Sequence, residues 1–198
     1  MQYTGCRPLK DWEHEAIIAH VGGKYPLRDA ALIEFGIRTG FRLSEILSLR
    51  VGDIFRDGRI LDVVTIKRCW MKGRRASRTM PIHPKSAARL YNWLIEAGYT
   101  VEGMDNQPVF SRQKTSNAMS RVQGWHVIKN AAQSAGLDAT RLASHSLRKT
   151  FASNMWQSSF VATDMAKMAR LLGHENYSNT LKYIEFLDDS LERAVLAA

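Results

Sequence analysis

The sequence predicts a mainly α-helical domain with a small antiparallel β-sheet, an α+β fold built from 198 residues. Apolar residues recur at helical spacing over most of the chain, whereas residues 54–66 and 80–82 are rich in strand formers. The hydrophobic share of 45% suits one globular domain, or a large and a small lobe, with a real core. We therefore expect a helical body that carries one sheet.

The first forty residues predict two helices. The second begins at Pro26, a favoured first helical position, and stops before Gly40. Its residues are apolar nearly all round, which predicts a buried helix. A short helix follows, with the apolar residues Leu43, Ile46, Leu47 and Leu49.

A strand pattern replaces the helical one after Asp53. Residues 54–66 read as strand, turn and strand around Asp57–Gly58, which predicts a hairpin, and residues 80–82 predict a third strand. The segment 67–78 between them holds no acidic residue and six basic ones: Lys67, Arg68, Lys72, Arg74, Arg75 and Arg78. The sequence thus predicts a strongly basic turn at one edge of the sheet.

Helical spacing returns after the sheet. Four apolar stripes predict four helices that pack in the core: Ala87, Leu90 and Leu94; Trp125, Ile128, Ala132 and Ala135; Leu147, Phe151 and Met155; and Val161, Met165, Met168 and Leu172.

The charge of the chain indicates its kind of partner. Lysine and arginine total 28 against 19 acidic residues, a formal net charge of +9, which is typical of nucleic-acid binders but also of ribosomal and membrane-surface proteins. No apolar run approaches the ~20 residues that span a bilayer, and the N-terminus does not look like a signal peptide. Cys6 and Cys69 provide neither a disulfide framework nor a zinc site. We expect a cytoplasmic protein.

Three local patterns place phosphate-binding side chains at helix ends. Arg42 follows a glycine at the start of a helix, and its guanidinium fork suits two oxygens of one phosphate. His145 and Arg148 are three residues apart and share a helix face. Gly173 is suited to end a helix, so that His174 projects from the helix end. Taken singly, each residue also fits a structural or solvated role.

The order and spacing of these motifs resemble the tyrosine recombinases of the phage-integrase family, over about residues 8–190. The motifs are TGFRLSE at 39–45, Lys72-Gly73 ahead of a strand ending in Pro81-Ile82, HSLRKTFA at 145–152, and LGH at 172–174 with Tyr183 nine residues later. The resemblance implies the tyrosine recombinase catalytic-domain fold. It also implies site-specific DNA recombination through a covalent 3′-phosphotyrosyl intermediate, as in integration, excision or inversion of mobile DNA.

The resemblance further implies the residues of the active site. The catalytic set is Arg42, Lys72, His145, Arg148, His174 and Tyr183. In the family the arginines and histidines hold the phosphate, the tyrosine attacks it, and the lysine gives a proton to the leaving 5′ oxygen. Glu45 matches a supporting acid that orients the site. A free tyrosine has a pKa of ~10, and arginines with a bound phosphate favour its ionised form as the new bond develops.

Two assignments have an alternative. Tyr177 lies only three residues after His174, and the family spacing, with Thr180 ahead of the nucleophile, favours Tyr183. Lys67, at the end of the preceding strand, is the alternative to Lys72. The residues Lys67, Arg68, Arg74, Arg75 and Arg78 are expected to contact DNA phosphates without reading sequence, or to be solvated.

The resemblance also sets expectations for cofactors and partners. No metal or nucleotide cofactor is implied, and no Cys/His spacing or acidic cluster suggests one. The implied partners are double-stranded DNA and further copies of the chain, as a tetramer on two DNA sites, with no membrane. The implied location is the cytoplasm, on DNA, for a bacterial, archaeal or phage-encoded enzyme.

The catalytic pattern occupies nearly the whole chain. We expect residues 1–198 to be one catalytic domain without the N-terminal core-binding domain of most integrases, either excised or natural. The amphipathic segment 186–198 is expected to pack on its own core or on a neighbouring subunit. Two other functions stay open on the sequence: a type IB topoisomerase, and a catalytically silent DNA-binding relative.

Overall fold

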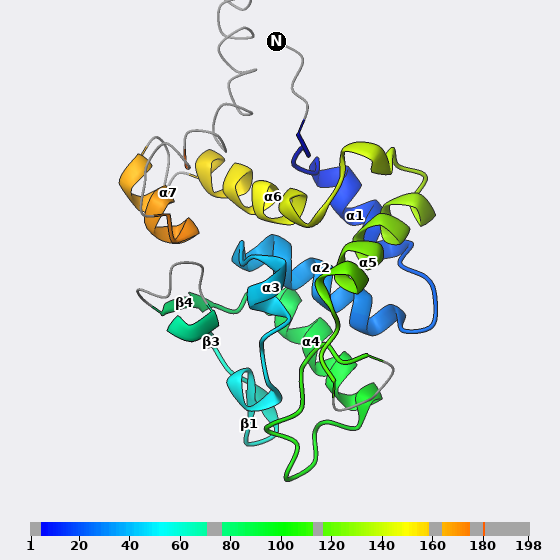
Figure 1. The fold of residues 1–198 in the computed structure, drawn as a ribbon, viewed down its shortest axis with the longest axis vertical. Coiled ribbons are helices and arrows are strands. Elements are labelled where there is room, and N and C mark those ends of the chain that lie inside the picture. The colour runs from blue at the N-terminus through cyan, green and yellow to red at the C-terminus, as the bar shows by residue number, and fades with distance from the viewer. Residues whose placement is uncertain (1–4, 71–76, 113–116, 159–163, 175–179, 181–198) are drawn as a thin grey trace, which may run out of the picture.

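The computed structural model describes residues 5–70, 77–112, 117–158, 164–174 and 180 (Figure 1). Its helices are α1 (Asp11–Ala19), α2 (Pro26–Thr39), α3 (Leu43–Ile46), α4 (Pro84–Ala97), α5 (Arg121–Ser134), α6 (Ser144–Gln157) and α7 (Met165–Leu172). Its strands are β1 (Phe55–Arg56), β2 (Arg59–Ile60), β3 (Val63–Ile66) and β4 (Arg78–Pro81), and its 3-10 turns are η1 (Val51–Asp53), η2 (Arg68–Trp70) and η3 (Ala139–Arg141). The mainly helical α+β fold predicted from the sequence is confirmed. None of the described helices has the length and apolar character that a membrane span needs.

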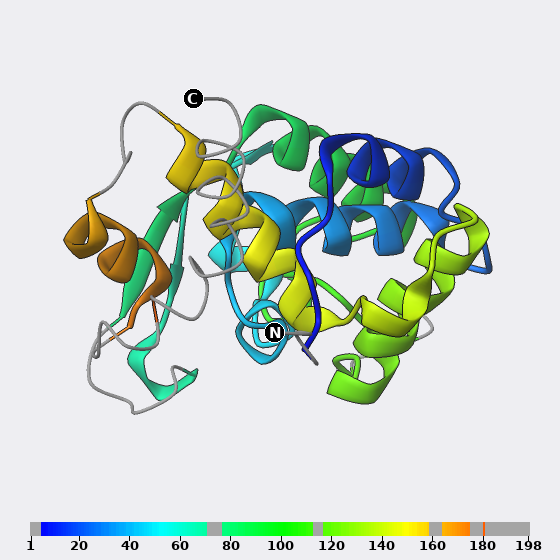
Figure 2. The same ribbon diagram turned by 90° about the horizontal axis from the view of Figure 1, so that it is seen from above.

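Helix α2 forms the centre of the core, as its all-round apolar character predicts, and packs against both α4 and α6 (Figures 1 and 2). Two glycines let α6 come close. A Cβ on Gly36 would lie 2.8 Å from Cδ1 of Leu147, and one on Gly40 only 2.3 Å from Cδ1 of Phe151. Gly40 also ends α2 in the left-handed conformation, with φ 61°, as predicted. The C-terminal end of α2 therefore lies directly against α6.

Helix α5 buries Ile128 and Ala132 of the expected stripe but not Trp125. Its buried residues include Gly124, Val127 and Ile128, whereas Trp125 is 38% exposed, so the prediction that Trp125 packs in the core stripe is wrong. Gly124 lies where the buried face approaches Leu43, with 3.0 Å between its would-be Cβ and Cδ1 of Leu43. Because Gly124 carries no hydrophobic side chain, the apolar spacing did not mark it as a core position and marked Trp125 instead.

The strands form two separate antiparallel ladders, β1–β2 and β3–β4, rather than the one sheet expected. Asp57 and Gly58 both have positive φ, 52° and 76°, and make the predicted hairpin turn between β1 and β2. The stretch 60–66 is not one strand, because Leu61 donates its backbone N–H to Ile54 while the carbonyl of Asp62 accepts from Ile82. The β3–β4 ladder lies next to α7 (Figure 2).

The N-terminal segment is bonded to α6. Leu9 donates its backbone N–H to Oγ1 of Thr150 over 2.8 Å, and Nζ of Lys149 donates to the carbonyl of Cys6 over 2.6 Å. Thr150 lies on the side of α6 away from Arg148, whereas Lys149 comes one turn after His145. The N-terminal segment thus holds α6 close to the turn that carries His145 and Arg148.

Candidate active site

Arg42, His145 and Arg148 line one open pocket of about 790 Å³. They come from the start of α3 and from α6, segments about a hundred residues apart in the chain. The structure therefore brings together three of the residues that the sequence proposed. Among the described residues, no group of three His, Cys, Asp or Glu side chains could hold a metal ion.

Glu45 holds Arg42 at the start of α3. Its Oε2 accepts from the backbone N–H of Arg42 over 2.8 Å, and its Oε1 accepts from Nη1 of Arg42 over 2.7 Å. Glu45 is fully buried, while the side chain of Arg42 is 23% exposed and reaches the pocket. One carboxylate thus satisfies an unpaired amide of the first helical turn and orients the guanidinium. This arrangement is what an orienting acid requires.

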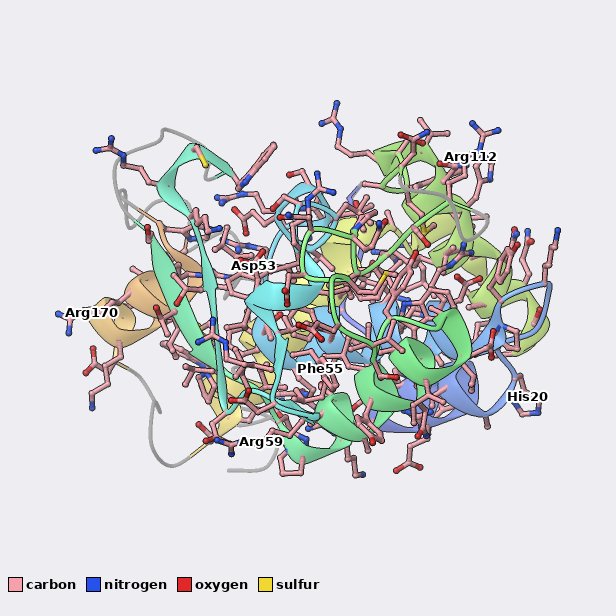
Figure 3. All side chains as sticks on the ribbon, turned by 90° about the horizontal axis from the view of Figure 1, so that it is seen from below. His20, Asp53, Phe55, Arg59, Arg112 and Arg170 are labelled. Atoms are coloured by element: carbon pink, nitrogen blue, oxygen red, sulfur yellow. The ribbon has the colours of Figure 1, made fainter. Side chains whose placement is uncertain are left out.

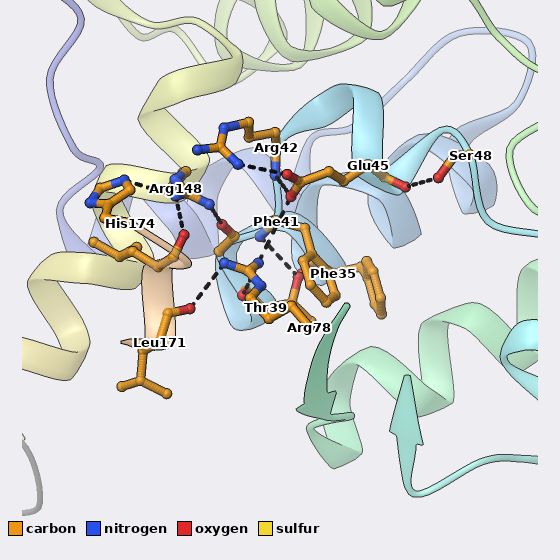
Figure 4. Close-up of polar contacts among 12 residues, drawn as sticks. Phe35, Thr39, Phe41, Arg42, Glu45, Ser48, Arg78, Arg148, Leu171 and His174 are labelled. Atoms are coloured by element: carbon orange, nitrogen blue, oxygen red, sulfur yellow. Dashed lines mark hydrogen bonds and ion pairs between the residues drawn. The ribbon is translucent and has the colours of Figure 1, made fainter. Parts of the chain in front are cut away.

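Arg148 is 1% exposed and links two helix ends. Its Nη1 donates to the carbonyl of Gly40, at the end of α2, over 2.6 Å. Its Nη2 donates to the carbonyl of Leu172, at the end of α7, and lies 2.9 Å from Nε2 of His174 (Figure 4). The last carbonyls of a helix have no partner within the helix and carry its negative dipole end, so they stabilise a buried cation.

His174 follows Gly173, which ends α7 in the left-handed conformation with φ 62°, as predicted. Because a guanidinium can only donate, Nε2 of His174 accepts from Arg148, and the ring proton is on Nδ1. Nδ1 then donates to Oγ1 of Thr180 over 3.0 Å. Burial, with the charges of Arg148, Arg42 and Arg78, lowers the pKa of His174 to about 3, so the ring is neutral at physiological pH.

Arg78 lies differently from the expected phosphate-contacting position, because its side chain is 7% exposed and points inward. Nη1 donates to the carbonyl of Leu171 over 3.0 Å and Nη2 to that of Thr39 over 3.4 Å. Burial, followed by the charge of Arg148, lowers the pKa of Arg78 to about 9. Strand alternation is the signal that could have placed it, since Arg78 is two residues before the buried Met80.

The other basic residues of the turn are only partly described. Lys67 is 67% exposed, and its Nζ lies 3.3 Å from Oδ1 of Asp53. Arg68 is also exposed and begins η2. Lys72, Arg74, Arg75, Tyr177, Tyr183 and the segment 186–198 lie outside the described residues.

Three exposed apolar side chains at the pocket were not proposed as site residues from the sequence. Trp70 from η2 is 54% exposed, and Val122 and Trp125 from α5 are 64% and 38% exposed. Apolar groups grouped beside cationic ones at an open pocket are typical of a surface that meets a partner. The signal that could have found the α5 pair is the i, i+3 spacing of Val122 and Trp125, offset from the buried stripe.

Curated relatives resemble the chain at 26–30% identity. The probable integrase/recombinase YoeC of Bacillus subtilis is 28% identical over 169 residues, covering 84% of this chain and 82% of the relative. The tyrosine recombinase XerD of Yersinia pestis is 30% identical over 168 residues, covering 84% of this chain but 52% of the relative. The chain thus spans about half the length of the XerD and XerC relatives that it matches.

Solved structures confirm the expected catalytic-domain fold. The XerH site-specific recombinase, in a post-cleavage complex with its palindromic difH substrate, superposes with a TM-score of 0.72 at 24% identity over 96% of this chain and 52% of that one. The catalytic domain of bacteriophage HP1 integrase matches with a TM-score of 0.58 at 19% identity, over 96% of this chain and 94% of that one. A family model described as the phage integrase family matches residues 8–189, nearly the full length, and the chain therefore belongs to the phage integrase family.

Proposed function

We propose that this chain is the catalytic domain of a site-specific DNA recombinase that cuts and rejoins strands through a phosphotyrosyl bond from Tyr183. The observation that carries the proposal is the meeting of Arg42, His145 and Arg148 in one pocket, with His174 bonded to Arg148. Family membership and the printed names of the relatives, which are recombinases and integrases, point the same way.

The proposed chemistry is an in-line displacement at a DNA phosphate. Oη of Tyr183, which has lost its proton to solvent, attacks phosphorus as the phenolate, the bond to the 5′ oxygen breaks, and the 3′ phosphate stays on the tyrosine. Arg42, His145 and Arg148 face the non-bridging oxygens, where phosphoryl transfer gathers charge. Lys72 gives the leaving oxygen its proton. Rejoining reverses these steps, because the phosphotyrosyl bond retains the energy of the cut bond.

The bonds of Arg148 and Arg42 support this role. Both guanidiniums are held by hydrogen bonds before DNA arrives, Arg148 by helix-end carbonyls and Arg42 by Glu45. Donors that are already in place lose little free energy in reorganisation when the transition state forms, which is the main source of electrostatic catalysis. The neutral ring of His174 can keep donating from Nδ1 to Thr180 while Nε2 faces Arg148.

The proposed partner is double-stranded DNA, and the proposed assembly is a tetramer on two DNA sites. The net charge of +9 supports binding to the phosphate backbone. XerH has been solved on its difH DNA and the Tn1549 integrase on transposon DNA, and both share this fold. We propose a DNA-associated location in the cytoplasm, with residues 1–198 as one catalytic domain.

Covalent capture tests the proposal. The chain is incubated with nicked, sheared genomic DNA of the organism that encodes it. A nick a few nucleotides to the 3′ side of the cut lets the short fragment with the free 5′ hydroxyl diffuse away, which traps the adduct. Protein-bound DNA is recovered under denaturing conditions and sequenced. We expect recovery of one sequence class, with the protein attached to a 3′ phosphate.

Two phenylalanine variants serve as a matched pair. Tyr183→Phe removes the proposed nucleophile and is expected to abolish the adduct, whereas Tyr177→Phe is expected to leave it. An adduct that persists in Tyr183→Phe would refute the assignment, and no adduct with the unsubstituted chain would refute the function. Relaxation of supercoiled plasmid without a preferred sequence would instead identify a topoisomerase.

A further inference from the structure

Arg78 is the first residue of β4, yet its side chain contacts elements that carry the phosphate-binding residues. Its fork donates to the carbonyl of Leu171 over 3.0 Å and to that of Thr39 over 3.4 Å. Leu171 precedes His174 by three residues, and Thr39 precedes Arg42 by three residues. A single guanidinium therefore spans the two helix ends from which these side chains emerge (Figure 4).

Arg78 also faces the acid that orients Arg42. Its Nη2 lies 4.0 Å from Oε2 of Glu45, and Glu45 binds both the backbone and the side chain of Arg42. The plane of the Phe41 ring lies beneath the guanidinium, with 4.1 Å between Cζ and the ring centroid. These contacts fix the orientation of Arg78 as well as its position.

The burial of Arg78 argues against a merely stabilising role. Its Nε has no hydrogen-bond partner among the residues that the structure describes, and the charges of Arg148 and Arg42 oppose its own. A buried cation with an unsatisfied donor beside other cations costs free energy that an apolar side chain would not. An arginine there is explained by geometry, since only its planar fork can reach both carbonyls at once.

Its own strand links this bridge to the β3–β4 ladder. Arg78 pairs with Ile66 in the β3–β4 ladder and lies six residues after Lys72 in the chain. The same side chain thus ties the end of the β3–β4 ladder to the ends of α2 and α7. Figure 2 shows the ladder and α7 next to each other.

We propose that Arg78 is a positioning residue, which sets the distance between Arg42 and His174 by bridging the ends of α2 and α7 and by facing Glu45. This inference rests on the proposed function for its effect on catalysis. It replaces the direct phosphate contact that the basic turn suggested. A misplacement of about 1 Å at a reacting centre can slow a reaction about 100-fold, so the bridge matters for rate rather than for DNA affinity.

The test compares Arg78→Met, which keeps an unbranched apolar side chain but removes charge and fork, with Arg78→Lys, which keeps the charge alone. Arg59→Met is the matched control, because Arg59 is exposed in β2 and its loss changes net charge equally; Figure 3 shows it near the edge of the molecule. Single-turnover cleavage is measured with saturating protein on a nicked duplex of the captured sequence. As long as folded protein stays saturating over DNA, a partial loss of folded protein leaves this rate constant unchanged.

We expect the rate constant to fall about 100-fold in Arg78→Met and about tenfold in Arg78→Lys, with no change in Arg59→Met. DNA affinity and its salt dependence are expected to stay as they are. A normal rate constant in both Arg78 variants would overturn the inference. So would weaker binding with a salt slope reduced by about one, since that identifies a direct phosphate contact.

A second readout needs no DNA. The imidazole nitrogen signals of His174 are recorded by NMR, with exposed His126 as the internal control. Arg78→Lys is expected to shift the signals of His174 and to leave those of His126, because the charge remains while the bridge to Leu171 is lost. Unchanged His174 signals would refute the positioning role, whether or not the unsubstituted chain cleaves DNA. A failure of the unsubstituted chain to cleave DNA would by itself refute only the proposed function.

Discussion

Arg78 and Arg148 bridge the same two helix ends, and the carbonyls that they bind at each end belong to adjacent residues. Arg78 donates to the carbonyls of Thr39 and Leu171, and Arg148 donates to those of Gly40 and Leu172. Two cations tolerate this proximity because the carbonyls at a helix C-terminus lack partners within the helix and carry its negative dipole end. Two arginines from a strand and a helix thus hold the ends of α2 and α7 together, and the residues around them can be tested one at a time.

Gly40 is expected to be intolerant of any side chain. Gly40→Ala combines a left-handed φ of 61° with a Cβ 2.3 Å from the Phe151 ring, whereas Gly98→Ala has a similar φ of 71° and open space. We expect unfolding free energy to fall by about 1 kcal/mol for Gly98→Ala and by about 3 kcal/mol for Gly40→Ala, because only the latter adds overpacking. Urea unfolding measures both. Equal losses of unfolding free energy in the two variants would show that α6 can move away from the new methyl group without destabilising the fold.

Glu45 is expected to stabilise the fold as well as orient Arg42. Glu45→Gln leaves Arg42 and buried Arg78 without their carboxylate, and the unfolding free energy should fall by about 3 kcal/mol. The control is Lys167→Met, which breaks an exposed ion pair with Asp164 and should leave the unfolding free energy nearly unchanged. Similar losses from the two variants would contradict the buried network.

His174 is expected to make stability depend on pH in the acid range. Folding lowers its pKa from 6.5 to about 3, so between these values the unfolded chain binds more protons than the folded chain. Its contribution to stability is therefore complete above about pH 6.5 and is lost as pH falls toward 3. His174→Gln should lose less stability than the unsubstituted chain between pH 7 and 4. Parallel pH profiles of unfolding free energy would contradict this.

The Thr180 hydroxyl is expected to hold the imidazole of His174 in place. Thr180→Val leaves the Nδ1 proton without its acceptor, which should cost about 1–2 kcal/mol of unfolding free energy and shift the Nδ1 signal in the imidazole nitrogen NMR spectrum, while Arg148 still keeps the proton on Nδ1. Thr65→Val is the matched control, because Thr65 bonds Thr79 on an exposed sheet face. Its effect should stay within about 0.5 kcal/mol. An unchanged Nδ1 signal together with an unchanged unfolding free energy in Thr180→Val would refute the role of the hydroxyl.

Residue preferences along the chain predicted most helix boundaries correctly. They failed where the structure depends on a packing partner that the sequence pattern does not show. Pro26, Gly40 and Gly173 placed helix ends correctly, because their backbone preferences act within one turn. Trp125 was misassigned because the residue that packs is Gly124, against Leu43. The stretch 60–66 was read as one strand because nothing in its composition shows the break at Leu61 and Asp62.

The sequence by itself determined the helical body, the helix ends and the resemblance in motif order, since these depend on residue type and spacing along the chain. Only the tertiary structure decided that Arg42, His145 and Arg148 share one pocket, and that Arg78 turns inward while Trp125 turns out. The reason is that side-chain partners distant in the chain, such as the carbonyls of Thr39 and Leu171, are set by how helices pack. From the sequence alone, Arg78 in its basic turn is expected to be solvated, and only the packed ends of α2 and α7 provide the carbonyls that bury it.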